Sequence, residues 1–121
     1  MAYVFTQATG IQKVVAWRLI APSTSGGKVY SIAVVGTEVW TAWGQHRAAG
    51  PSGAGSQAKI IECASPTAAD DWAWKQTLEK QEKGYRLDIA PRAIEIDVAR
   101  GTVLGVMERM LKLGEPINIY S

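Results

Sequence analysis

A chain of 121 residues with 47% hydrophobic and 20% charged residues has the size and composition of one globular domain. Its single cysteine, Cys63, excludes an internal disulfide, and no run approaches the roughly 18 apolar residues that a membrane span needs. Residues 1–59 carry five basic side chains against one acid, whereas residues 60–121 carry eight against ten. We therefore expect the basic first half to face an anionic partner.

The amino terminus and the cysteine content bear on the compartment. Residues 1–6 contain no basic segment followed by a long apolar run, so we expect no secretory signal peptide. Small secreted domains often carry several disulfides, which this chain cannot form. We therefore expect a cytoplasmic protein with no membrane partner.

Short runs of β-branched and aromatic residues dominate the first third of the chain. Residues 3–5 and 14–20 are the first two runs, and a loop rich in serine and glycine follows at residues 22–27. The next two runs, residues 29–35 and 38–43, are separated only by a Gly-Thr pair. This spacing predicts a β-hairpin.

A loop, a strand and a helix are predicted in the middle of the chain. Residues 44–57 contain four glycines and predict a loop, and residues 59–63 predict a further short strand. Ser65, followed by a proline, is typical of a helix start, and Gly84 is typical of a helix end. We therefore expect a helix between Ser65 and Gly84.

The second half adds one strand, one helix and a short final strand. Within the first helix, Trp72 and Trp74 point in nearly opposite directions, so one of them must leave the sheet. Residues 86–89 predict a strand and residues 97–113 a second helix, which two glycines weaken by about 1 kcal/mol each. Residues 117–120 predict a final strand.

These elements predict an α+β fold. We expect an antiparallel β-sheet with one helix packed on a face, plus a C-terminal helix. The sequence shows no internal repeat and no linker, so we expect residues 1–121 to form a single domain.

Catalytic and metal-binding patterns are absent from the sequence. His46 is the only histidine, and no zinc-type spacing or nucleophile motif relates it to Cys63. The glycine-rich stretch at residues 50–55 lacks the ending of a P-loop, so we interpret it as a flexible loop whose backbone amides could touch a phosphate. We expect no metal, no cofactor and no enzymatic activity.

The stretch from Trp43 to Arg47 is the most informative candidate site. Tryptophan can stack on a base or a sugar, glycine allows a close approach, and arginine can hold a phosphate. If the strand stays extended, Trp43, Gln45 and Arg47 share one face, with Arg47 about 7 Å beyond Gln45. In the alternative interpretation, Trp40 and Trp43 are core residues and Arg47 is a solvated charge.

Motifs in order along the chain resemble a WGR domain, a family named for its Trp-Gly-Arg signature. They are Arg18-Leu19, residues 28–32, residues 39–44, the glycine loop, Ala69, Lys80 and Lys83-Gly84-Tyr85. The resemblance covers residues 17–86. It leaves residues 87–121 as a C-terminal extension with a helix.

The resemblance implies a sheet with a helix on one face and a role in binding DNA. In DNA-dependent poly(ADP-ribose) polymerases, such domains help to bind DNA breaks through the signature tryptophan and arginine, and in bacteria they also occur alone. Trp43 and Gly44 correspond to the first two signature residues, whereas Gln45 stands in the place of the arginine. We expect Arg47 to supply the contact that this departure removes.

We therefore predict a non-catalytic module that binds nucleic acid, DNA rather than RNA, at ends, nicks or other structured sites without base-sequence specificity. The candidate binding residues are Trp43, Gly44, Gln45, Arg47, Lys28 and Lys59. The alternative is a protein-interaction or assembly module, such as a phage or plasmid accessory protein, with exposed tryptophans as a partner or homo-oligomer surface. A basic groove around Trp43 and Arg47 would favour the first hypothesis, and an apolar patch around Trp74 or Met107 the second.

Overall fold

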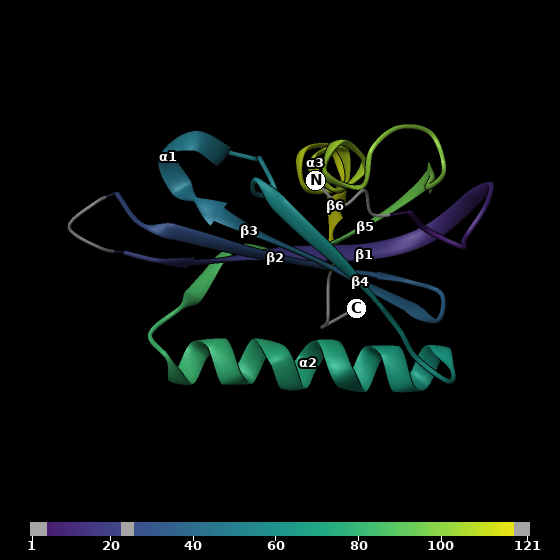
Figure 1. The fold of residues 1–121 in the computed structure, drawn as a ribbon, viewed down its shortest axis with the longest axis horizontal. Helices are drawn as coiled ribbons and strands as arrows, with labels where there is room; N and C mark the ends of the chain where they lie inside the picture. The colour runs from purple at the N-terminus through teal and green to yellow at the C-terminus, as the bar shows by residue number, and fades with distance from the viewer. Residues whose placement is uncertain (1–4, 23–25, 118–121) are drawn as a thin grey trace.

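The sheet has six antiparallel strands in the order β4-β3-β2-β1-β5-β6, and helices cover both of its faces (Figure 1). This computed structural model describes residues 5–22 and 26–117. The strands are β1 (Ile11–Ala21), β2 (Lys28–Val35), β3 (Glu38–Gln45), β4 (Gln57–Glu62), β5 (Arg86–Asp97) and β6 (Glu115–Pro116). The helices are α1 (His46–Ala49), α2 (Pro66–Glu82) and α3 (Val103–Leu113). The predicted α+β fold with an antiparallel sheet is confirmed.

Helix α2 lies along one face of the sheet, which we call the α2 face (Figure 1). Ser65 caps the helix by accepting a hydrogen bond from the backbone N–H of Ala68 at 3.0 Å. The buried stripe of α2 consists of Ala69, Ala73 and Thr77, which are small residues spaced four apart. Small side chains on this stripe let the helix lie close to the strands, with Trp17, Leu19, Tyr30, Ile32 and Val39 in the core beneath it.

Trp17 joins β1 to α2 in two ways. Its indole N–H donates to the Thr77 hydroxyl at 2.9 Å, and its ring stacks on Trp74 with centroids 4.8 Å apart. Trp74 is 48% exposed, whereas Trp72 is half-buried against the same core. The prediction that one of the two helix tryptophans leaves the sheet is therefore wrong, because Trp72 packs against the core and Trp74, although partly exposed, stacks on Trp17 of β1.

Helix α3 and the short α1 lie on the opposite face of the sheet (Figure 1). The apolar stripe of α3 includes Val106, Met107 and Met110, all fully buried against β1, β5 and β4. Thr102 caps this helix by accepting a hydrogen bond from the backbone N–H of Gly105 at 3.1 Å. The exposed apolar patch considered around Met107 is therefore wrong, because this residue belongs to the core.

The predicted boundaries of the second half need correction. Strand β5 runs through Asp97 because its second half pairs with the start of β1, so the helix starts at Val103 and not at residue 97. The strand predicted over residues 3–5 falls outside the described residues except for Phe5, which is not in a strand. The strand predicted over 117–120 likewise leaves only Ile117 described, also outside a strand, and the final pairing is made by β6.

The segment from residue 87 onward is an integral part of this architecture. Strand β5 pairs with β1 along most of its length, and α3 closes one of the two hydrophobic cores. Among residues 5–22 and 26–117, no helix is long and apolar enough to cross a membrane.

Candidate functional site

A groove of about 720 Å³ opens on the α2 face, where β2 begins and β3 ends. It lies between the sheet, the last turns of α2 and the segment that leads into β5. Its lining residues are Lys28, Val29, Tyr30, Trp43, Gly44, Gln45, Ala48, Ser56, Gln57, Gln76, Lys80 and Tyr85. No Asp or Glu occurs among these lining residues of the described chain, so the charge inside the groove comes from lysine.

The register of three strands builds the floor of the groove. Tyr30 on β2 lies opposite Trp43 on β3, which in turn lies opposite Gln57 on β4. Lys28 lies opposite Gln45, two residues farther along the same two strands. Because directly paired residues, and residues two apart, share one face of a sheet, all five side chains belong to the α2 face.

Helix α2 supplies one wall of the groove. Gln76 and Lys80 lie one turn apart, and the Gln76 side-chain amide donates to the Tyr30 hydroxyl at 3.3 Å. The Lys80 ammonium stands 4.5 Å from the centre of the Tyr30 ring and 5.4 Å from that of Tyr85, both within cation–π range. Lys80 is therefore held between two aromatic rings.

Burial shifts the pKa values of both Tyr30 and Lys80. It raises the pKa of the Tyr30 hydroxyl, which stays protonated at neutral pH despite the opposing hydrogen bond from Gln76. It also lowers the pKa of Lys80, and repulsion from Lys83 acts in the same direction.

The Lys-Gly-Tyr sequence after α2 folds the chain back onto the groove. Gly84 has a φ of +98°, a backbone conformation that suits glycine. The Tyr85 N–H then donates to the Lys80 carbonyl at 3.0 Å, which returns the tyrosine ring to the lysine. This motif thus places two of the groove's side chains.

Gly44 provides room for the glycine-rich loop. The Ser56 N–H donates to the Trp43 carbonyl at 2.9 Å. A Cβ on Gly44 would lie 2.8 Å from the Ser56 nitrogen, and a Cβ on Gly55 would lie 2.5 Å from the Trp43 carbonyl oxygen. The Trp-Gly pair therefore allows the loop to pack directly against the end of β3.

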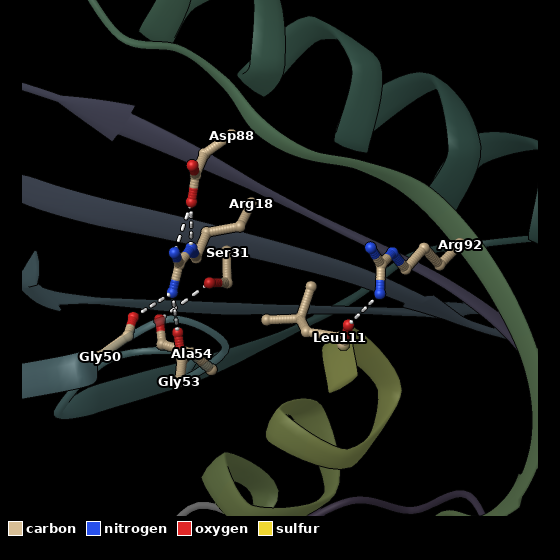
Figure 2. Close-up of polar contacts among 8 residues, drawn as sticks. All are labelled: Arg18, Ser31, Gly50, Gly53, Ala54, Asp88, Arg92 and Leu111. Atoms are coloured by element: carbon tan, nitrogen blue, oxygen red, sulfur yellow. Dashed lines mark hydrogen bonds and ion pairs between the residues drawn. The ribbon is translucent and has the colours of Figure 1, made fainter. Parts of the chain in front are cut away.

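Arg18 anchors this loop from the other face of the sheet (Figure 2). Arg18 is 1% exposed, and its guanidinium donates to the carbonyls of Gly50 and Gly53 at 2.9 Å each and to the Asp88 carboxylate at 2.8 Å. Ser31 adds a hydrogen bond to the Ala54 carbonyl at 2.8 Å. The loop that we interpreted as flexible is thus tied to β1 and β2 through its carbonyl groups, with Gly53 and Ala54 buried.

Four of the six predicted binding residues line the groove: Lys28, Trp43, Gly44 and Gln45. Arg47 and Lys59 do not. The strand was expected to stay extended through Arg47, which is wrong: β3 ends at Gln45, and Arg47 lies exposed in the helical turn α1. Lys59 lines a separate hollow that includes Gln7 and Glu62.

Sequence reasoning missed several groove residues. Lys80 and Tyr85 carried part of the family resemblance but were not proposed as site residues. Gln57 and Gln76 carried no signal, because their place in the groove depends on the pairing of β4 and on the position of α2.

The side chains considered for catalysis lie elsewhere. His46 starts α1, and Cys63 follows β4, with its N–H bonded to the Thr37 carbonyl at 2.9 Å. Within the described parts of the chain, no group of three or more His, Cys, Asp or Glu residues is placed to hold a metal ion.

Part of this chain is similar to a solved structure. No protein-family model matches the chain, and no curated protein matches it. A crystal structure of a protein from Bacteroides fragilis, solved as a structural genomics target, is similar at 28% identity with a TM-score of 0.48. The match covers 63% of this chain but only 19% of that protein.

Proposed function

We propose that the chain is a non-catalytic, cytoplasmic module of the WGR type that binds nucleic acid, with DNA preferred to RNA. The observation that supports this proposal is the groove that gathers Lys28, Trp43, Gly44 and Gln45 without a lining acid. Polyanions are drawn to such a site by lysine, and aromatic rings add stacking that does not depend on base sequence.

The size of the groove favours a local feature of DNA over a long duplex. Few cations line it, whereas a duplex-tracking surface needs many. The proposed ligand is therefore an end, a nick or another structured site. We propose that Arg47, which is exposed in the turn next to lining residue Ala48, extends the phosphate contacts beyond the groove.

The salt dependence of binding tests this function. Fluorescence anisotropy is measured with blunt, nicked and single-stranded DNA and with RNA at several salt concentrations. With about two to four phosphate contacts, log K against log salt should slope at roughly −2 to −3.5. Absence of binding at low salt, or a flat slope, would contradict the proposal.

The variant Lys28→Ala tests whether Lys28 contacts a phosphate inside the groove. This variant should weaken binding to every ligand and reduce the size of the salt slope by about 1, because it removes one phosphate contact. The matched control is Lys13→Ala, which removes an exposed lysine at the opposite end of β1 from the groove. Equal effects of the two changes would place the binding surface elsewhere.

A protein-interaction or assembly role is the second candidate. Trp74 and Leu78 lie one turn apart on α2 and are 48% and 58% exposed, which gives the helix an apolar strip. This role predicts concentration-dependent association in analytical ultracentrifugation that Leu78→Lys abolishes. A monomer at all concentrations that captures no partner would remove this candidate.

A further inference from the structure

The groove is lined by rings and amides more than by cations. Three aromatic residues, Tyr30, Trp43 and Tyr85, and three glutamines line it, against two lysines. One of these, Lys80, already contacts two of the rings, so Lys28 is the lysine best placed to meet a phosphate. A surface that binds only the phosphate backbone of a nucleic acid would have more cations than rings and amides.

The floor of the groove combines a stacking surface with hydrogen-bonding groups. Trp43 is half-buried in the centre, with Gln57 directly beside it on β4 and Gln45 two residues farther along β3. Each glutamine amide carries two donors and an acceptor, which suits the edges of nucleobases. About 720 Å³ is within the range of pockets that hold small organic ligands.

We propose that this groove receives a single unstacked nucleobase, which packs against Trp43 while Gln45 and Gln57 bond its edge and Lys28 holds the adjoining phosphate. The inference rests on the proposed function and specifies which part of the nucleic acid enters the groove. Since a glutamine amide offers both donors and an acceptor, the site tolerates different bases. Unstacked bases occur at frayed ends, gaps and single strands, which links the pocket to structured DNA.

Two oligonucleotides of equal length and charge test the pocket. One is oligothymidine, and the other is the same deoxyribose-phosphate chain without bases. Removing the bases should weaken binding about 5- to 150-fold, the range expected for one lost stacking contact, and should leave the salt slope unchanged. Equal affinities for the two would overturn the base pocket and leave the proposed function standing. Failure of both to bind at low salt would overturn the base pocket, and the proposed function falls with it only if the blunt and nicked duplexes also fail to bind.

Glutamine variants locate the effect in the groove. Gln57→Ala should bring the affinity for oligothymidine several-fold closer to that for the base-free chain, because it removes a partner of the base edge. The control, Gln81→Ala, removes an exposed glutamine of α2 that does not line the groove and should change neither affinity. If Gln57→Ala behaves as Gln81→Ala does, the base does not enter this groove.

Discussion

Glu38 is the first residue of β3 and lies at the end of this strand away from the groove. Its carboxylate fixes that end of the strand. Its side chain accepts hydrogen bonds from the Thr6 hydroxyl, from the Gln7 N–H at 2.9 Å and from the Trp40 indole at 3.0 Å. Burial alone would raise the pKa of Glu38, but these hydrogen bonds outweigh burial and hold the pKa below its ordinary value of 4.5. The ionised form is therefore the one that the fold stabilises.

The pH dependence of stability follows from the lowered pKa of Glu38. A carboxyl whose folded pKa is lowered stabilises the protein above its unfolded pKa and loses that contribution as pH falls through the folded pKa. Glu38→Gln should thus lower the free energy of unfolding by about 1–2 kcal/mol at pH 7. The difference from the native chain should shrink below about pH 4.5. Urea unfolding at several pH values measures it, and a difference that does not vary with pH would contradict this role.

The sequence was sufficient for some site residues and insufficient for others, for physical reasons. Trp43, Gly44 and Gln45 could be predicted because they are consecutive at the end of a recognisable strand. Arg47 was misplaced, because alternation applies only while the strand continues and β3 ends at Gln45. Gln57 could not be predicted, since it meets Trp43 only through the pairing of β3 with β4.

At the scale of elements, local patterns predicted the strands that alternate regularly and the helix with clear ends. The hairpin of β2 and β3 and the capped helix α2 are confirmed. The second half of β5 was missed because Pro91 and Arg92 interrupt its apolar pattern. Pairing with β1 outweighs this weak local signal.

The glycine-rich loop is the element that Arg18 positions. The planar guanidinium holds Gly50, Gly53 and Asp88 together, a geometry that a lysine ammonium cannot reproduce. Arg18→Lys should therefore cost about 1.5–3 kcal/mol of stability. It should also weaken binding of oligothymidine without changing the salt slope, because Arg18 positions the loop that leads into the lining residues Ser56 and Gln57 and does not itself line the groove.

Hydrogen exchange separates this positioning effect from a general loss of stability. The Ser56 N–H, bonded to the Trp43 carbonyl, should exchange faster in Arg18→Lys, whereas amides in the middle of β2 should lose protection only in proportion to global stability. Unchanged protection of Ser56 together with unchanged affinity would show that the loop does not depend on Arg18.

At the scale of the whole molecule, the two faces of the sheet have different roles. The α2 face carries the groove at one end, whereas the opposite face carries α3 and the loop anchored by Arg18 (Figures 1 and 2). Arg92 ties β5 to α3 through a hydrogen bond to the Leu111 carbonyl at 2.9 Å. The region that resembles a WGR domain, residues 17–86, ends at the first residue of β5 and lacks α3, so we infer that it depends on the extension for a complete core.

Substitutions within α3 test this dependence in the intact chain. Met107 is fully buried between the helix and the sheet, so Met107→Ala should leave a cavity and lower the free energy of unfolding by about 2–5 kcal/mol. The matched control is Leu113→Ala, at a residue of the same helix that is 60% exposed, and it should stay within about 0.5 kcal/mol of the native chain. Urea unfolding followed by circular dichroism measures both.

Because α3 supports β1 and β5, a single cooperative transition at lower urea is expected for Met107→Ala, with no separate unfolding of α3. An early transition that removes only helical signal, with the tryptophan environment of α2 intact, would show instead that the extension folds independently of the groove.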